Sequence, residues 1–144
     1  MHNRNDYMVL EVPSLRENVA LVRVTVAAFA ARLPFTIAEL EELKVAVSEA
    51  VTNAIVHAYP ATTGCIRIEA VIIDGGVKVS VIDDGRGLVA AKSKITDEGE
   101  EQRTGMGFSF MESFTDDLSV TSPAQGGTAV HMIKRPARQR EEHE

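Results

Sequence analysis

The sequence predicts an α+β fold, a two-layer sandwich of helices on a mixed, mostly antiparallel sheet. Two long stretches with helical spacing of apolar residues come early in the chain. The apolar period then changes to two, which is typical of half-buried strands. Helices and strands do not alternate as they would in a parallel α/β protein. The 144 residues suit one domain, expected over residues 1–134, with a mobile tail at 135–144.

The N-terminal part predicts a strand followed by a helix. Apolar residues alternate with polar or smaller ones over residues 7–12, which favours a strand, and Pro13 ends it. Ser14 is expected to be the N-cap of the next helix, with Glu17 completing a capping box. This first helix is expected to end at about Leu33.

A second capping box, formed by Thr36 and Glu39, predicts the start of a second helix. Its apolar residues recur every three or four positions, as expected for a helix with one buried face. The helix is expected over residues 37–59, where Pro60 stops it.

The remainder predicts strands with one short helix. The expected strands are residues 66–72, 77–82, 118–121 and 128–133. Asp74, Gly75 and Gly76 favour a tight hairpin between the first two strands. A polar segment at 89–104 is typical of a functional lid or of a disordered loop, and a short helix is expected over 106–114.

Composition excludes several classes of protein. The formal charge is −6, which argues against general nucleic-acid binding, because phosphate contacts need a basic field. One cysteine, Cys65, excludes an internal disulfide and a cysteine-based zinc cluster. The N-terminus lacks the apolar stretch of a signal peptide, and no segment is long enough to span a bilayer. We therefore expect a cytoplasmic domain without membrane or direct nucleic-acid partners.

Glu49 and Asn53 lie four residues apart on the second expected helix, and so share one face. An amide oxygen can ligate Mg²⁺, and a nearby carboxylate can accept the proton of a nucleophile. Taken alone, the pair is more typical of a solvated acid and an ordinary helical asparagine.

Two glycine-containing segments follow expected elements. Asp83-Asp84-Gly85-Arg86-Gly87 places a carboxylate at a strand end, where it could accept a hydrogen bond from the amino group of adenine. An ordinary Asp-Gly turn is the alternative. In Thr104-Gly105-Met106-Gly107-Phe108, two glycines before a helix would let consecutive amides face phosphate oxygens. A lone Gly-x-Gly is weak evidence for a phosphate-binding turn. The occurrence of all three features in this order is much more specific for a nucleotide site.

Together with Ser48-Glu49-Ala50-Val51-Thr52-Asn53-Ala54, these segments resemble the N, G1 and G2 boxes of the ATPase family of gyrase, Hsp90, histidine kinases and MutL. Residues 23–29 and the Met111-Glu112 stretch resemble, within that family, the small anti-sigma serine kinases. Among these the chain is most similar to the sporulation anti-sigma factors that act on sigma F. The resemblance covers residues 7–133 and implies a Bergerat-type ATP-binding fold.

The resemblance implies a role for each matching residue. Asn53 would hold Mg²⁺ on the phosphates of ATP or ADP, and Glu49 would be the base that prepares the attacking serine hydroxyl. Asp83 would read the adenine amino group, with Gly85 and Gly87 leaving room for the base.

The remaining implied site residues lie further along the chain. Thr128 would support the adenine pocket, directly or through water. Arg103 would meet the γ-phosphate as a lid arginine, although a solvated loop charge is the alternative. The expected phosphate-binding segment contains Thr104, Gly105, Met106 and Gly107.

The implied protein is a serine/threonine kinase that transfers the γ-phosphate of ATP to a serine of an anti-anti-sigma protein. As a homodimer, it would also hold a sigma F-like sigma factor inactive. ATP would favour the sigma complex, and ADP the complex with the anti-anti-sigma protein. Arg23 matches a partner contact of the family, while an ordinary exposed arginine is the alternative.

Two other functions stay open. The segment 89–104 is shorter than the family's lid and lacks its aromatic and proline residues. The chain could therefore be a nucleotide-gated sigma-binding module with little kinase activity. It could also be a stress-response anti-sigma kinase with a different sigma partner.

Overall fold

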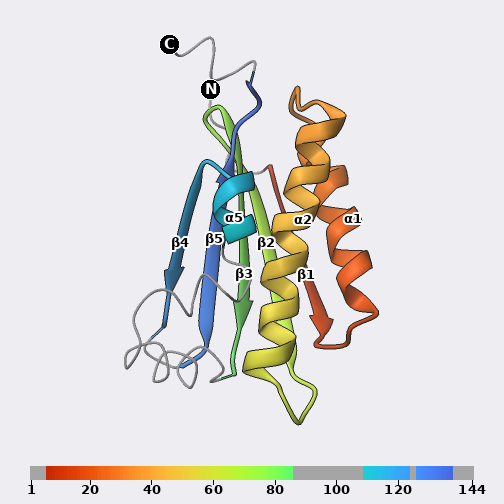
Figure 1. Cartoon of the computed structure of the whole chain (residues 1–144), viewed down its shortest axis with the longest axis vertical. Coiled ribbons are helices and arrows are strands. Elements are labelled where there is room, and N and C mark those ends of the chain that lie inside the picture. The colour runs from red at the N-terminus through yellow and green to blue at the C-terminus, as the bar shows by residue number, and fades with distance from the viewer. Residues whose placement is uncertain (1–5, 86–108, 124–125, 138–144) are drawn as a thin grey trace.

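Helices cover one face of a sheet in the computed structural model, which describes residues 6–85, 109–123 and 126–137 (Figure 1). Within these ranges, five strands form one sheet in the order β1-β2-β3-β5-β4, and each neighbouring pair is antiparallel. The strands are β1 (Tyr7–Pro13), β2 (Cys65–Ile73), β3 (Gly76–Asp83), β4 (Asp117–Thr121) and β5 (Thr128–Lys134). The predicted two-layer α+β sandwich is confirmed. The sheet was expected to be mixed, but its described pairs are purely antiparallel.

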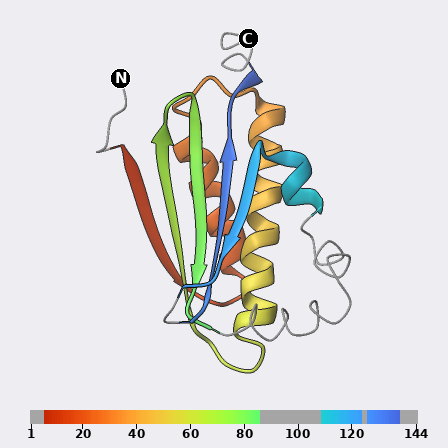
Figure 2. The same cartoon turned by 90° about the vertical axis from the view of Figure 1, so that its left-hand side faces the viewer.

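The helical layer consists of α1 (Asn18–Ala30), α2 (Ile37–Asn53) and the short α5 (Ser109–Phe114). Figure 2 shows the sheet with these helices behind it, and no described helix covers the near face. Alternate strand residues point into the space between the layers, among them Ile66, Ile68 and Val79, all fully buried. The core therefore lies between α1, α2 and the sheet.

The predicted capping box at Ser14 is wrong. The helix α1 begins four residues later, its N-cap is Glu17, and no side chain caps it. Ser14 instead pairs with Gly64: its Oγ accepts from Gly64 N at 2.9 Å, and its N donates to Gly64 O at 2.9 Å. The serine hydroxyl thus fixes the loop before β2.

The predicted box at Thr36 and Glu39 is confirmed. Thr36 Oγ1 accepts from Glu39 N at 3.1 Å, and Glu39 Oε1 accepts from Thr36 N at 2.8 Å. The α2 helix that begins here does not remain α-helical to residue 59. After Asn53 it widens into a π-helix, η1 (Ala54–Ala58). Single π turns within helices occur frequently at functional sites.

The predicted hairpin between β2 and β3 is confirmed, with Gly75 at a φ of 79°. At the same end of the sheet as this hairpin, β5 ends at Lys134, and the next residues contact the helical layer. Ala137 N donates to Glu39 Oε2 at 2.8 Å. The predicted polar segment 89–104, the first residues of the helix expected at 106–114, and residues 138–144 of the expected tail lie outside the described residues.

Candidate functional site

Asp83 is the last residue of β3, and its side chain is buried. It lies between Ile66 of β2 and Thr128 of β5 in the strand register. Its Oδ1 accepts a hydrogen bond from Gly85 N at 3.1 Å. The central strand of the sheet therefore ends in a carboxylate, on the side that faces the helices.

The surroundings of Asp83 raise the pKa of its carboxyl to about 6. Burial is the main cause, because desolvation disfavours the charged form. The neighbouring charge of Asp84 also raises the pKa, while hydrogen bonds from the backbone of Gly85 and Thr128 lower it. An incoming hydrogen-bond donor would stabilise the charged form.

The backbone is packed closely around this carboxylate. A Cβ on Gly127 would lie 2.1 Å from Asp83 O, and Gly127 has a φ of +87°. A Cβ on Gly85 would lie 2.4 Å from Ala58 O, so only glycine lets the turn approach η1. The described structure thus gives Gly85 a packing role beside its predicted role of leaving room for adenine.

Three buried polar atoms find no hydrogen-bond partner among the described residues: Asn53 Nδ2, Thr128 Oγ1 and Ser48 Oγ. Buried polar groups are nearly always paired, because an unpaired one costs free energy. Two of these atoms belong to predicted nucleotide-binding residues. Ser48, which sequence reasoning did not select, is adjacent to Glu49, and no spacing pattern distinguishes it.

Glu49 and Asn53 both lie on the last two turns of α2, and both side chains are partly buried. In Figure 1 the C-terminal end of α2, the end of β3 and the start of β5 lie at the same end of the molecule. The contact of Gly85 with Ala58 joins the helix end to the Asp83 turn. The fold therefore brings Asn53, Asp83, Gly85 and Thr128 to one end, with Glu49 one helical turn away.

The other predicted residues of this site lie outside the described residues, so their positions stay predictions: Gly87, Arg103, Thr104, Gly105, Met106 and Gly107. Among the described residues, no three His, Cys, Asp or Glu side chains cluster to hold a metal ion.

Tyr59 follows η1 and was not selected from the sequence. Its hydroxyl donates to Cys65 O at 2.9 Å and accepts from Asp84 N at 2.8 Å. Burial raises the pKa of this phenol, and the nearby charges of Asp83 and Asp84 add to the effect. A tyrosine before Pro60 gives no periodic signal, so only the fold shows its place beside Asp83.

Arg23, the predicted partner contact, lies on the exposed side of α1. Two large apolar residues of α1 are also exposed, Leu21 at 49% and Val24 at 56%. Exposed arginine and large apolar side chains are both frequent on protein-binding surfaces.

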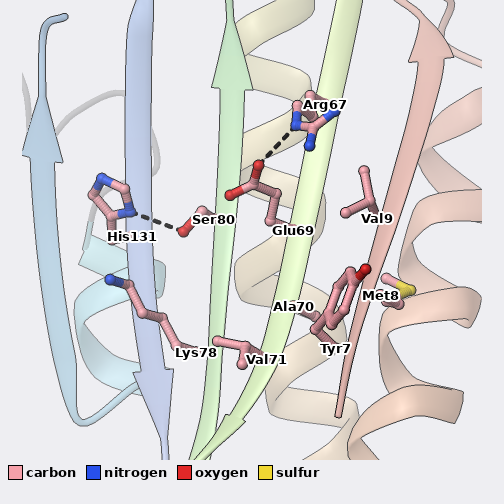
Figure 3. A pocket seen from close by; sticks show the side chains of 10 residues that line it. All are labelled: Tyr7, Met8, Val9, Arg67, Glu69, Ala70, Val71, Lys78, Ser80 and His131. Atoms are coloured by element: carbon pink, nitrogen blue, oxygen red, sulfur yellow. Dashed lines mark hydrogen bonds and ion pairs between the residues drawn. The ribbon is translucent and has the colours of Figure 1, made fainter. Parts of the chain in front are cut away.

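The uncovered face of the sheet has a hollow of about 380 Å³, shown in Figure 3. Tyr7 and Val9 of β1 form an apolar side. On β5, Nδ1 of His131 forms a hydrogen bond with Ser80 Oγ at 2.8 Å. Burial lowers the pKa of His131, and the charge of Lys78 adds to this. This hollow lies on the opposite face of the sheet from the Asp83 carboxylate.

Comparisons with known proteins match residues 12–134 to the family described as "Histidine kinase-like ATPase domain". A protein of Caldanaerobacter subterraneus named anti-sigma F factor is 44% identical over 140 residues, which cover 94% of this chain and 98% of the relative. The anti-sigma F factor of Bacillus thuringiensis is 41% identical, over 91% of this chain and 92% of the relative.

Among solved structures, the RsbU and RsbW domains of a Mycobacterium tuberculosis protein match with a TM-score of 0.63 at 22% identity. The match covers 89% of this chain and 32% of that one, and it supports the fold. Within the described residues, no helix is long and apolar enough to cross a membrane.

Proposed function

Because this chain belongs to the histidine kinase-like ATPase family, and within it to the anti-sigma F factors, we propose that it is a serine/threonine protein kinase that also inhibits a sigma factor. Its substrates are ATP with Mg²⁺ and a serine of an anti-anti-sigma protein. Its sigma partner is a sporulation factor of the sigma F type, and both partners meet it in the cytoplasm.

The observation that carries the nucleotide site is the set of buried polar groups at one end of the fold. Asp83 is a buried carboxylate, and Thr128 Oγ1 and Asn53 Nδ2 are buried without described partners. An adenine amino group would donate to Asp83, and Thr128 would hydrogen-bond the base directly or through water. Such groups fit a bound nucleotide, because the ligand supplies the partners that the described residues do not.

Asn53 would hold the metal through its amide oxygen, and Mg²⁺ would neutralise charge on the phosphates. In the proposed transfer, the serine oxygen forms a bond to the γ-phosphorus while the bond to the ADP oxygen breaks. Glu49 takes the proton of the serine hydroxyl. Phosphoryl transfer of this kind depends mainly on positioning and charge stabilisation, and Arg103 and the segment 104–107 are proposed to supply part of both.

The test is to incubate the protein with radiolabelled ATP, Mg²⁺ and a candidate anti-anti-sigma protein. We expect label on one serine of the partner, identified by mass spectrometry. Glu49→Gln should abolish transfer while calorimetric ATP affinity stays within about twofold. Asn53→Ala should remove the Mg²⁺-dependent part of ATP binding. Glu112→Gln, an exposed acid of α5, is the control and should transfer normally.

Two results would contradict these assignments. Transfer at the normal rate by Glu49→Gln would exclude this residue as the base. ATP-dependent binding of the sigma factor without phosphate on any partner would instead favour a nucleotide-gated binding module. Binding of a stress-response sigma factor in preference to sigma F would reassign the partner.

Arg23 is proposed to contact a protein partner, together with the exposed apolar side chains of α1. Its exposure on a helix that also exposes Leu21 and Val24 supports this assignment. Arg23→Ala should weaken partner binding and leave ATP affinity unchanged.

The uncovered sheet face supports the proposed homodimer. It exposes Tyr7 at 59% and Val9 at 42%, and carries both acidic and basic groups, including the paired Arg67 and Glu69. A surface with apolar groups and both signs of charge can complement its own copy about a two-fold axis. Val9→Glu should shift sedimentation to the monomer, whereas Val24→Glu on α1 should not.

A further inference from the structure

The hydroxyl of Tyr59 joins two backbone groups that are far apart in the sequence. It donates to the carbonyl of Cys65, at the start of β2, and accepts from the amide of Asp84, just after β3. A phenol offers one donor and an acceptor oxygen, so both functions of this hydroxyl are used. The two bonds hold the beginning of one strand against the end of its neighbour.

The ring of Tyr59 is itself held from the other side. A Cβ on Gly64 would lie 2.1 Å from Tyr59 Cε1, so the ring lies directly on the glycine backbone. Gly64 is in turn fixed by its two hydrogen bonds to Ser14. The ring therefore cannot shift toward the loop without breaking these contacts.

The turn that Tyr59 holds is the one that carries Asp83. The amide of Asp84 is bonded to the phenol, and the next amide, of Gly85, is bonded to the Asp83 carboxylate. Gly85 also packs on the backbone of Ala58, at the end of η1. Consecutive contacts thus connect the helix that carries Asn53 to the turn that orients Asp83.

We propose that Tyr59 is a positioning residue for nucleotide recognition: its hydroxyl fixes the turn 83–85 and so aims the Asp83 carboxylate at the adenine amino group. The inference rests on the proposed nucleotide site. Tyr59 need not touch the nucleotide, because it acts through the backbone of Asp84. Loss of the hydroxyl should therefore affect recognition of the base more than binding of the phosphates.

The experiment compares ATP and GTP binding by calorimetry in the unsubstituted protein and in Tyr59→Phe. GTP carries an acceptor oxygen where adenine carries its amino donor. We expect the ATP dissociation constant to rise about five- to tenfold in Tyr59→Phe, the effect of one lost positioning hydrogen bond, with GTP binding changed less than twofold. The preference for ATP should shrink accordingly. Tyr7→Phe, the other tyrosine of the chain, is the control and should keep both constants.

A second variant perturbs the same contacts from the opposite side. Gly64→Ala should displace the ring and lower the ATP preference, and adding Tyr59→Phe should then have little further effect. Hydrogen exchange at the Asp84 amide should accelerate at least tenfold in both single variants. A purely structural tyrosine would lower the melting temperature without moving the ATP-to-GTP ratio.

The outcomes separate the inference from the proposed function. An unchanged ATP-to-GTP ratio in Tyr59→Phe, when Asp83→Asn loses that preference, would overturn the positioning role alone. If the unsubstituted protein binds no ATP, the proposed function is wrong and the inference with it.

Discussion

Asp83 combines burial with a pKa raised to about 6, where the proposed adenine site needs a charged acceptor. Because its pKa is raised, the folded protein holds this proton more tightly than the unfolded chain does. The free energy of unfolding should therefore fall as the pH rises from about 4 through about 6. ATP affinity should change in the opposite direction over this interval, because the adenine amino group needs the ionised carboxylate.

The measurement is the ATP dissociation constant between pH 5 and 8. ATP itself binds a proton near pH 6, so Asp83→Asn supplies the reference curve. Below pH 6 the ATP affinity of the unsubstituted protein should fall more steeply than that of Asp83→Asn. The slope of the logarithm of affinity against pH should be larger by up to one, which corresponds to one additional proton linked to binding. Parallel affinity curves for the two proteins would show that ionisation of Asp83 is not linked to ATP binding.

Thr128 offers a second prediction at this scale, since its Oγ1 is buried without a described partner. Thr128→Val keeps the shape and removes the hydroxyl. The free energy of unfolding without nucleotide should rise by about 1 kcal/mol, and ATP affinity should fall severalfold. Denaturant titration and calorimetry check the two effects. Thr121→Val, which removes a hydroxyl bonded to His131, should lower stability and leave ATP affinity unchanged.

The sequence could identify Asp83, Asn53 and Glu49 because their chemistry lies in short segments with fixed spacing. It could not identify Tyr59 or Ser48. The importance of Tyr59 depends on Cys65 and Asp84, which only the pairing of β2 with β3 brings to the phenol. Such contacts leave no local pattern in the chain.

At the scale of elements, the two expected capping boxes had different outcomes. Thr36 and Glu39 form both reciprocal hydrogen bonds, whereas Ser14 bonds to Gly64 and leaves α1 to begin at Asn18. A capping motif is only a local preference, and a distant backbone group can take the same hydroxyl. The widening of α2 into η1 was also not predictable, because the apolar spacing continues through it.

Thr36→Ala should lower the free energy of unfolding by about 1 kcal/mol, because the first turn of α2 loses its cap. Denaturant titration checks the value. Thr25→Ala is the comparison, since Thr25 bonds within α1 to Leu21 O and caps no helix end. Thr25→Ala should lower the free energy of unfolding clearly less than Thr36→Ala does. An equal loss in both variants would mean that the Thr36 hydroxyl contributes nothing particular to its helix.

At the scale of the whole molecule, the order of patterns was sufficient to predict two layers, since early helices and late strands can bury their apolar faces only against each other. The contacts that fasten the layers were not predictable. Lys134, at the end of the expected domain, is buried at the end of β5. Its Nζ donates to Glu42 Oε1 of α2 at 3.0 Å and to Phe114 O of α5 at 2.7 Å.

Lys134→Met tests how much this junction stabilises the fold. Methionine fills the buried volume and relieves the desolvation of the ammonium, and Glu42 is exposed enough to be hydrated by water. The carbonyl of Phe114 loses its charged donor, however, and this loss should dominate. We expect the free energy of unfolding to fall by about 1–2 kcal/mol, with faster hydrogen exchange in α5.

The matched control is Lys44→Met, because Lys44 pairs with Glu41 on the surface of α2 alone. A surface pair of this spacing contributes little, so the change in unfolding free energy should stay below about 0.5 kcal/mol. Both variants remove one positive charge. The difference between their changes in unfolding free energy therefore reports the contribution of the Lys134 hydrogen bonds and not the effect of net charge. Equal losses would mean that α2, α5 and β5 are held together by their apolar contacts, and that the buried ammonium only occupies space among them.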